Sequence, residues 1–159
     1  MAKSKAISAC EVIRKDHDGI KKLLHRYDIA GDAKEKENIV QELAVQLAEH
    51  SRVDETIIFP AASRMGEDES LVDELKDNDK CVKMHLAQVQ RLCSDVDKDE
   101  FESKMKELRS AVVTLIEREE QSLIPCMENT DYDLDALDRE VVKLRAGESI
   151  EPIKLRKKG

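Results

Sequence analysis

The residues best suited to chemistry in this sequence are histidines and acids that interrupt otherwise apolar helical faces. His50 and Asp54 are four positions apart, so in a helix they lie on one face, one turn from each other. Leu47 and Ile57 belong to the same face, which predicts that the imidazole and the carboxylate both point inward. An unpaired charge in that position is costly, so the pair needs a partner.

Three more polar residues interrupt the apolar faces of other segments: His17, His85 and Glu119. Taken singly, each has an ordinary explanation, either a core histidine with a hydrogen-bond partner or a partly exposed acid. No Lys or Arg clearly shares the inward faces at their level, and imidazoles converging with carboxylates are typical of a metal site. Because four segments each contribute a candidate ligand at a similar depth in the expected fold, a metal site is the favoured interpretation. His25 is expected at the edge of the fold and is left out.

Apolar residues recur every three or four positions and predict the helices that must carry these side chains. Four long helices are expected over about residues 7–30, 34–64, 71–94 and 100–127, and a short fifth over 134–145. Pro60 should kink or stop the second helix. Short connections favour an all-α, up-down-up-down antiparallel four-helix bundle, with residues 1–130 forming the bundle. Residues 131–159 are expected to form the short helix and a basic tail, packed on the bundle or trailing from it as a frayed end.

The composition excludes several classes of protein. The chain has 159 residues, about one domain, and its 35 acidic and 27 basic residues give a net charge of −8, which argues against nucleic acid as a partner. It has no tryptophan and no apolar run long enough to cross a membrane. The four scattered cysteines and the lack of an apolar leader predict reduced thiols and a cytoplasmic location. The sequence indicates no particular protein partner.

Three segments and one histidine carry a family resemblance. They are KDHDGI at residues 15–20, EHSRVDETIIFP at 49–60, EREEQSLIP at 117–125, and His85. Over about residues 11–128 the chain resembles the hemerythrin-like, or HHE cation-binding, family. The second and third segments also echo each other, since each contains two adjacent acids, two further residues, two apolar residues and a proline, at 54–60 and at 119–125.

The resemblance implies a four-helix bundle that holds two non-haem iron ions and binds or reacts with dioxygen, peroxide or nitric oxide. By position, His17, His50 and His85 match the family's histidine ligands. Asp54 and Glu119 match its bridging carboxylates. Manganese and zinc are alternative metals, and if the protein is an enzyme, breakdown of peroxide is the first expectation.

The sequence also departs from the family pattern. Thr114 or Leu115 stands where members have a histidine before the last carboxylate, Cys81 stands where some have a second histidine, and Asp54 replaces a common glutamate. An open coordination position, a water or thiolate ligand, or a mononuclear site would each follow from these changes. Cys81 is expected to be a small core residue rather than a ligand. Two further alternatives are an iron- or redox-sensing module without turnover and a bundle that has lost its metal.

Overall fold

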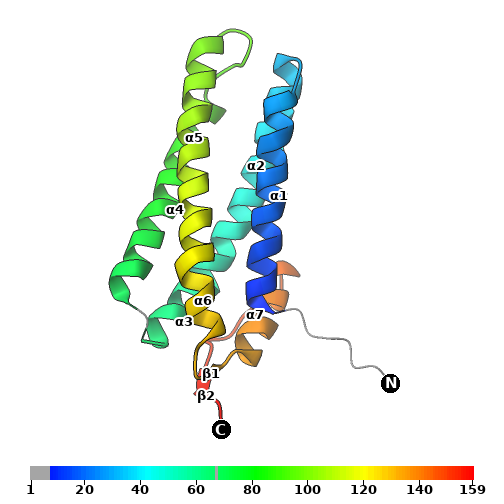
Figure 1. The fold of residues 1–159 in the computed structure, drawn as a ribbon. Coiled ribbons are helices and arrows are strands. Elements are labelled where there is room, and N and C mark those ends of the chain that lie inside the picture. The colour runs from blue at the N-terminus through cyan, green and yellow to red at the C-terminus, as the bar shows by residue number, and fades with distance from the viewer. Residues whose placement is uncertain (1–7, 67) are drawn as a thin grey trace.

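Four long helices form two antiparallel pairs in the computed structural model, which describes residues 8–66 and 68–159. Figure 1 shows α1 (Ala9–Ile29) beside α2 (Ala33–Val53), and α4 (Glu69–Gln90) beside α5 (Lys98–Arg118). The predicted all-α antiparallel bundle is confirmed. Ile7, the predicted start of the first helix, and Glu67, in the turn before α4, lie outside the described residues.

Polar side chains begin the first two helices. The hydroxyl of Ser8 accepts a hydrogen bond from the backbone N–H of Glu11, and the carboxylate of Asp32 accepts one from the N–H of Glu35. These caps satisfy backbone donors that have no partner within the helix. Within the described ranges, no helix combines the length and the apolar character that a membrane span requires.

The second and fourth predicted helices each contain a π-helical turn. Helix α2 continues into η1 (Asp54–Ile58) and α3 (Phe59–Arg64), and α5 continues into η2 (Glu119–Leu123) and α6 (Ile124–Glu128). A proline follows each π turn, as the second residue of α3 or α6. Because proline lacks an N–H and clashes with the preceding turn, the wider π turn lets the helix continue through it. Pro60 therefore does not end its helix.

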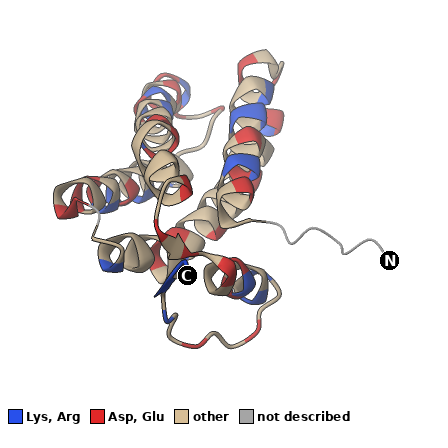
Figure 2. Ribbon diagram, turned by 60° about the horizontal axis from the view of Figure 1, so that its bottom comes forward, with Lys and Arg blue, Asp and Glu red and all other residues tan. Residues whose placement is uncertain are grey.

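The C-terminal segment packs against one end of the bundle (Figure 2). Helix α7 (Asp135–Arg145) buries Leu137, Val141 and Leu144 against the common core. It ends at Arg145, and Gly147, two residues farther on, has a φ of 75° that suits the left-handed position after a helix. Strand β1 (Tyr132–Asp133), which precedes α7, pairs antiparallel with β2 (Arg156–Lys157) in the basic tail.

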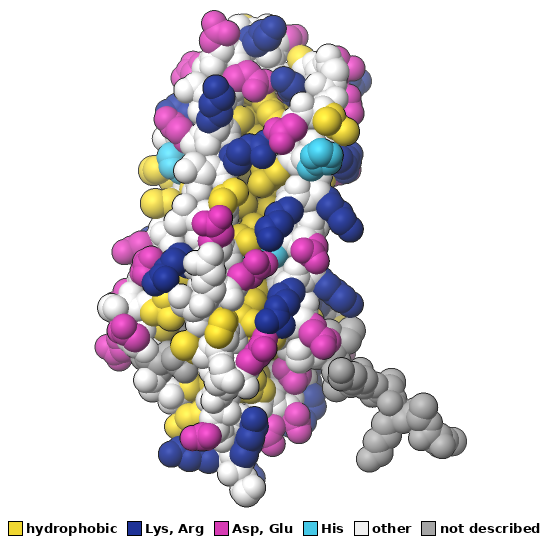
Figure 3. Space-filling model, viewed as in Figure 1, with side chains coloured by type: hydrophobic (Ala, Val, Ile, Leu, Met, Phe, Trp, Pro, Cys, Tyr) yellow, Lys and Arg dark blue, Asp and Glu magenta, His cyan; other side chains and the backbone are white. Residues whose placement is uncertain are grey.

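Charged side chains of both signs lie on the surface, as the composition of the sequence predicts. On the face drawn in Figure 3, basic and acidic side chains are interspersed along the helices. The core beneath consists mainly of Leu, Ile and Val together with Phe59 and Phe101. Among the described residues, four titratable side chains in this core are nevertheless no more than 1% exposed: His17, His50, Asp54 and Glu119.

Candidate metal centre

The four buried titratable side chains come from three stretches of the chain and meet at one point. His17 lies on α1, His50 near the end of α2, and Glu119 at the start of η2; one ligand atom from each lies within 4.8 Å of the others. Asp54, the first residue of η1, adds a carboxylate oxygen 3.0 Å from Nε2 of His50. The structure thus brings together four of the five residues predicted from sequence.

Both carboxylates stand at the first residue of a π turn. Asp54 and Glu119 each precede a proline by six positions, which is the internal echo seen in the sequence. A π turn widens the helix locally and is often found at functional sites. Here the two turns present the two carboxylates to the same buried space.

Each imidazole lies between two carboxylates. Nε2 of His17 and Nε2 of His50 lie 2.7 and 3.1 Å from the same oxygen, Oε2 of Glu119. On the opposite edges, Nδ1 of His17 lies 2.9 Å from Glu120, and Nδ1 of His50 lies 3.2 Å from Asp16. An ionised carboxylate can only accept, so each Nδ1 carries the hydrogen of its contact. A neutral ring then directs its Nε2 lone pair at an anion, which is stable only when a proton or a metal ion lies between them.

Three carboxylate oxygens of the cluster lack hydrogen-bond partners. Both oxygens of Asp54 and Oε1 of Glu119 are buried without one among the described residues. The contact of Asp54 with His50 is short, but its geometry does not form a hydrogen bond. An unsatisfied buried acceptor costs about 1–3 kcal/mol. Oxygen atoms in this state, beside two imidazole nitrogens, are suitable ligands for a metal cation.

The pKa values of His50, Asp54 and Glu119 also show that the buried carboxylates favour a positive charge beside them. Burial opposes protonation of His50, but the charges of Asp54 and Glu119 outweigh it and raise the pKa of His50 well above its ordinary value. Burial, together with the charge of Glu119, raises the pKa of Asp54. Burial would also raise the pKa of Glu119, but the charge of His50 and hydrogen bonds from both histidines lower it. The metal-free cluster therefore retains protons that a bound metal ion would displace.

A second layer of charges supports the histidines. Asp16, which contacts His50, also accepts a hydrogen bond from Arg145 of α7. Burial would raise the pKa of Asp16, but the hydrogen bonds from His50 and Arg145 lower it. Carboxylates on the outer nitrogen of metal-ligating histidines fix the ring and its tautomer. This layer was not predicted from the sequence, because Arg145 lies 129 residues from Asp16 and carries no local signal, although Asp16 is the neighbour of His17.

The structure does not bring His85 to this cluster. Nδ1 of His85 lies 3.6 Å from Glu107 of α5, and farther along the same helix pair Arg118 bonds Glu74 at 2.8 Å. Glu107 precedes Glu119 by twelve residues, which is about 18 Å of helical rise. The register between α4 and α5 therefore places His85 well away from the other four residues.

The structure also shows which side chains stand where the family has its other histidines. The α4 residues near Glu74, at the level of the cluster, include the buried Val72 and Leu75, which cannot bind a metal. Leu115 is buried and Thr114 is exposed, so neither replaces a histidine. Cys81 is exposed, which contradicts its expected place in the core.

One comparison with known proteins gives a match. The family model of the hemerythrin HHE cation-binding domain matches residues 8–127, which contain α1 to α5, all but the last residue of α6, and all four clustered side chains. Helix α7 and the β1–β2 pair lie outside the matched range. No curated protein and no solved structure shows significant similarity to the chain.

Proposed function

Because the chain belongs to the hemerythrin HHE cation-binding family, we propose that it binds iron through His17, His50, Asp54 and Glu119. The iron would bind or react with a small oxidant such as dioxygen, peroxide or nitric oxide. The observation that carries this proposal is the buried convergence of two imidazoles on carboxylates that lack hydrogen-bond partners. Manganese and zinc are the alternatives that metal analysis must exclude.

The ligand set favours one tightly held ion. His17 and His50 each offer one nitrogen, and Asp54 and Glu119 offer oxygens. A second ion bridged by these carboxylates would have no histidine of its own, because His85 lies elsewhere and Leu115 replaces the helix-four histidine. We therefore expect about one iron per chain.

The protein's own residues would prepare the site for that ion. Glu120 and Asp16 hold the Nδ1–H groups of His17 and His50, which keeps each Nε2 free to ligate. The surrounding Leu, Ile and Val side chains exclude water and strengthen the electrostatic contacts inside. Iron held by these residues would supply a coordination position for the oxidant and electrons for its reduction.

Elemental analysis of protein made in iron-supplied cells tests the proposal. We expect His50→Ala to lose most of its iron, because it removes a buried ligand. His25→Ala, an exposed histidine of α1, is the matched control and should retain wild-type iron. Equal iron in the His50 variant and the control would refute the assignment.

A sensing role without turnover is the second candidate. The observation in its favour is the contact between Arg145 of α7 and Asp16, which in turn contacts His50. Through this contact a change at the metal can affect how firmly α7 packs. Limited proteolysis after Met127, with and without iron, tests this role, and a count of peroxide molecules consumed per chain separates it from catalysis. Many turnovers without a change in proteolysis would favour the enzyme.

A further inference from the structure

A small cavity adjoins the candidate metal centre between α2, α4 and α5. Its volume is about 90 Å³. His50 lines it on the buried side, and the exposed residues Ala48 and Lys83 line it on the side of the solvent. Leu47, Val82, Leu86 and Leu115 make up most of the remaining wall. This space, which we call the His50 cavity, therefore leads from the surface to one of the proposed iron ligands.

The wall of the His50 cavity stands where a second metal ion would need ligands. Leu115 occupies the position of the helix-four histidine and precedes Glu119 by four residues, which is about 6 Å of helical rise. Val82 of α4 lines the same space. Neither side chain can bind a metal ion, so the volume beside the cluster is apolar and suits a different kind of occupant.

The polar side chains that line the cavity already have partners. Oγ of Ser51 donates a 2.8 Å hydrogen bond to Asp79, while Nζ of Lys83 lies 3.3 Å from Asp79 and bonds Glu55. Among the described residues, no side chain that lines the cavity has a buried polar atom without a hydrogen-bond partner. Apolar cavities of this kind hold no water and take up small apolar molecules such as xenon.

The size and polarity of the cavity select its occupant. One water molecule takes up about 30 Å³ in the liquid, so a space of about 90 Å³ holds a diatomic molecule. It is too small for an organic substrate, whose pockets measure about 300–1,000 Å³. Hydrogen peroxide fits by size, but its two hydroxyl groups would give up hydrogen bonds to water on passing apolar walls, which is costly. Dioxygen and nitric oxide are neutral and nearly apolar, so entry costs them little.

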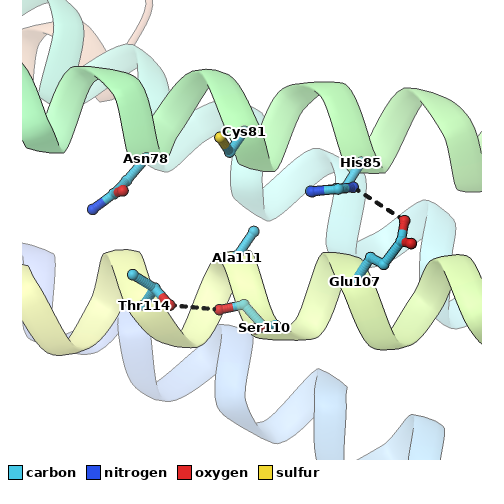
Figure 4. Close-up of a pocket in the computed structure, with 7 residues that line it drawn as sticks. All are labelled: Asn78, Cys81, His85, Glu107, Ser110, Ala111 and Thr114. Carbon is cyan, nitrogen blue, oxygen red and sulfur yellow. Dashed lines mark hydrogen bonds and ion pairs between the residues drawn. The ribbon is translucent and has the colours of Figure 1, made fainter.

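The larger groove between α4 and α5 is a poorer route to the cluster. Figure 4 shows polar side chains on its walls, among them Asn78, His85 and Glu107. Nδ2 of Asn78 and Nδ1 of His85 are buried there without hydrogen-bond partners among the described residues, so the groove favours water over a gas. No residue of the iron cluster lines it.

We propose that the His50 cavity receives the small oxidant of the iron site and restricts it to neutral diatomic molecules, dioxygen or nitric oxide. The inference rests on the proposed iron binding and narrows its ligand, because it excludes peroxide. Val82 and Leu115 are then specificity-determining residues, since they set the size and the polarity of the space against His50.

Xenon is a suitable probe of the cavity, because it is small, neutral and apolar. In crystals under xenon pressure, we expect an anomalous peak between Leu47, Val82 and Leu115. Val82→Phe, whose ring fills this space, should remove the peak. Val45→Phe is the matched control and should retain it, because Val45 is an exposed residue of α2 that does not line the cavity. A wild-type cavity without xenon would overturn the proposal.

The iron-loaded protein gives a second measurement, the rate at which its absorption spectrum changes on mixing with each oxidant. We expect dioxygen or nitric oxide to react at least tenfold faster than hydrogen peroxide at equal concentration, and the faster gas identifies the ligand. Val82→Phe should slow that gas at least tenfold at wild-type iron content, whereas Val45→Phe should not. Peroxide that reacts as fast as both gases, or a gas rate unchanged in Val82→Phe, would overturn the proposal.

The two wild-type results, xenon in the cavity and the ratio of rates, do not depend on how the variants fold. Failure of the proposed function would look different, because the cluster would then contain no iron whether or not xenon occupies the cavity. An iron-containing protein without xenon in the His50 cavity would refute this inference alone.

Discussion

Replacing Asp54 by Asn should stabilise the metal-free protein while weakening iron binding. Asp54 is fully buried, and neither oxygen has a hydrogen-bond partner among the described residues. Asn has nearly the same shape, cannot ionise, and provides an amide donor for Oε1 of Glu119, which also lacks a partner among the described residues. Satisfying one buried acceptor and removing another is worth about 1–3 kcal/mol. For a chain of this size each kcal/mol raises Tm by about 2–4 °C.

The iron-loaded protein should respond in the opposite direction. An ion held at one hundred times its Kd stabilises the folded state by about 2.7 kcal/mol, and the variant loses much of this because it lacks an anionic ligand. Asp54→Asn should therefore melt higher than wild type without metal and show a smaller rise in Tm when iron is added. A substitution that raises Tm without metal and reduces the stabilisation by iron is what we expect if Asp54 is a metal ligand.

The effect of pH has a definite sign as well. Burial and the charge of Glu119 raise the pKa of Asp54 well above its ordinary value of 3.8 in the folded state. A folded state that binds more protons than the unfolded state loses stability as pH rises. The advantage of Asp54→Asn in the metal-free protein should consequently grow as pH rises above about 4.

The assay is thermal unfolding, followed by circular dichroism, of chelator-treated and iron-loaded protein. Asp79→Asn is the matched control, because Asp79 is also buried but accepts a 2.8 Å hydrogen bond from Ser51 and lies 3.3 Å from Lys83. That substitution should leave the iron-induced rise in Tm intact. A metal-free Asp54→Asn protein that melts below wild type would refute the interpretation of Asp54 as an unsatisfied ligand.

Three further outcomes are expected. Asp16→Asn should weaken iron binding about 10–100-fold, because Asp16 supports His50 from the outer side; chelator competition measures this, and unchanged affinity would contradict it. In alkylation followed by mass spectrometry, Cys10 should react more slowly than Cys81, because Cys10 is buried and burial raises the pKa of its thiol to about 11; faster labelling of Cys10 would show that the first helix is not packed as described. Leu144→Ala should reduce the free energy of unfolding in urea by about 2–5 kcal/mol, and a change below about 0.5 kcal/mol would mean that α7 is not docked on the core.

Periodicity located most of the cluster because each residue lies on an otherwise apolar face. The four side chains share helix faces with apolar neighbours, so burial of those faces also buries His17, His50, Asp54 and Glu119. The two π turns were present in the sequence only as repeated acids and prolines. Their geometry depends on how proline is accommodated within a continuing helix, which local pattern does not specify.

The position of His85 relative to the cluster depends on the register between helices, which the spacing of residues within one helix does not give. Counting residues from helix ends gives the depth of a side chain only approximately, because the displacement of one helix along its neighbour depends on how their side chains pack. The contact of Glu74 with Arg118 shows where α4 and α5 lie relative to each other. The contact of Arg145 with Asp16 has the same origin, because it depends on where α7 packs after the bundle has formed. Positions on one helix face were predictable, whereas register between helices was not.

Diffraction from crystals of the iron-loaded protein, with anomalous data collected at the iron edge, tests the central claim most directly. We expect one strong peak per chain within coordination distance of Nε2 of both His17 and His50, with oxygens of Asp54 and Glu119 completing the protein ligands. An anomalous peak elsewhere in the protein, or no peak in this cluster in crystals of iron-saturated protein, would contradict the assignment of these four ligands.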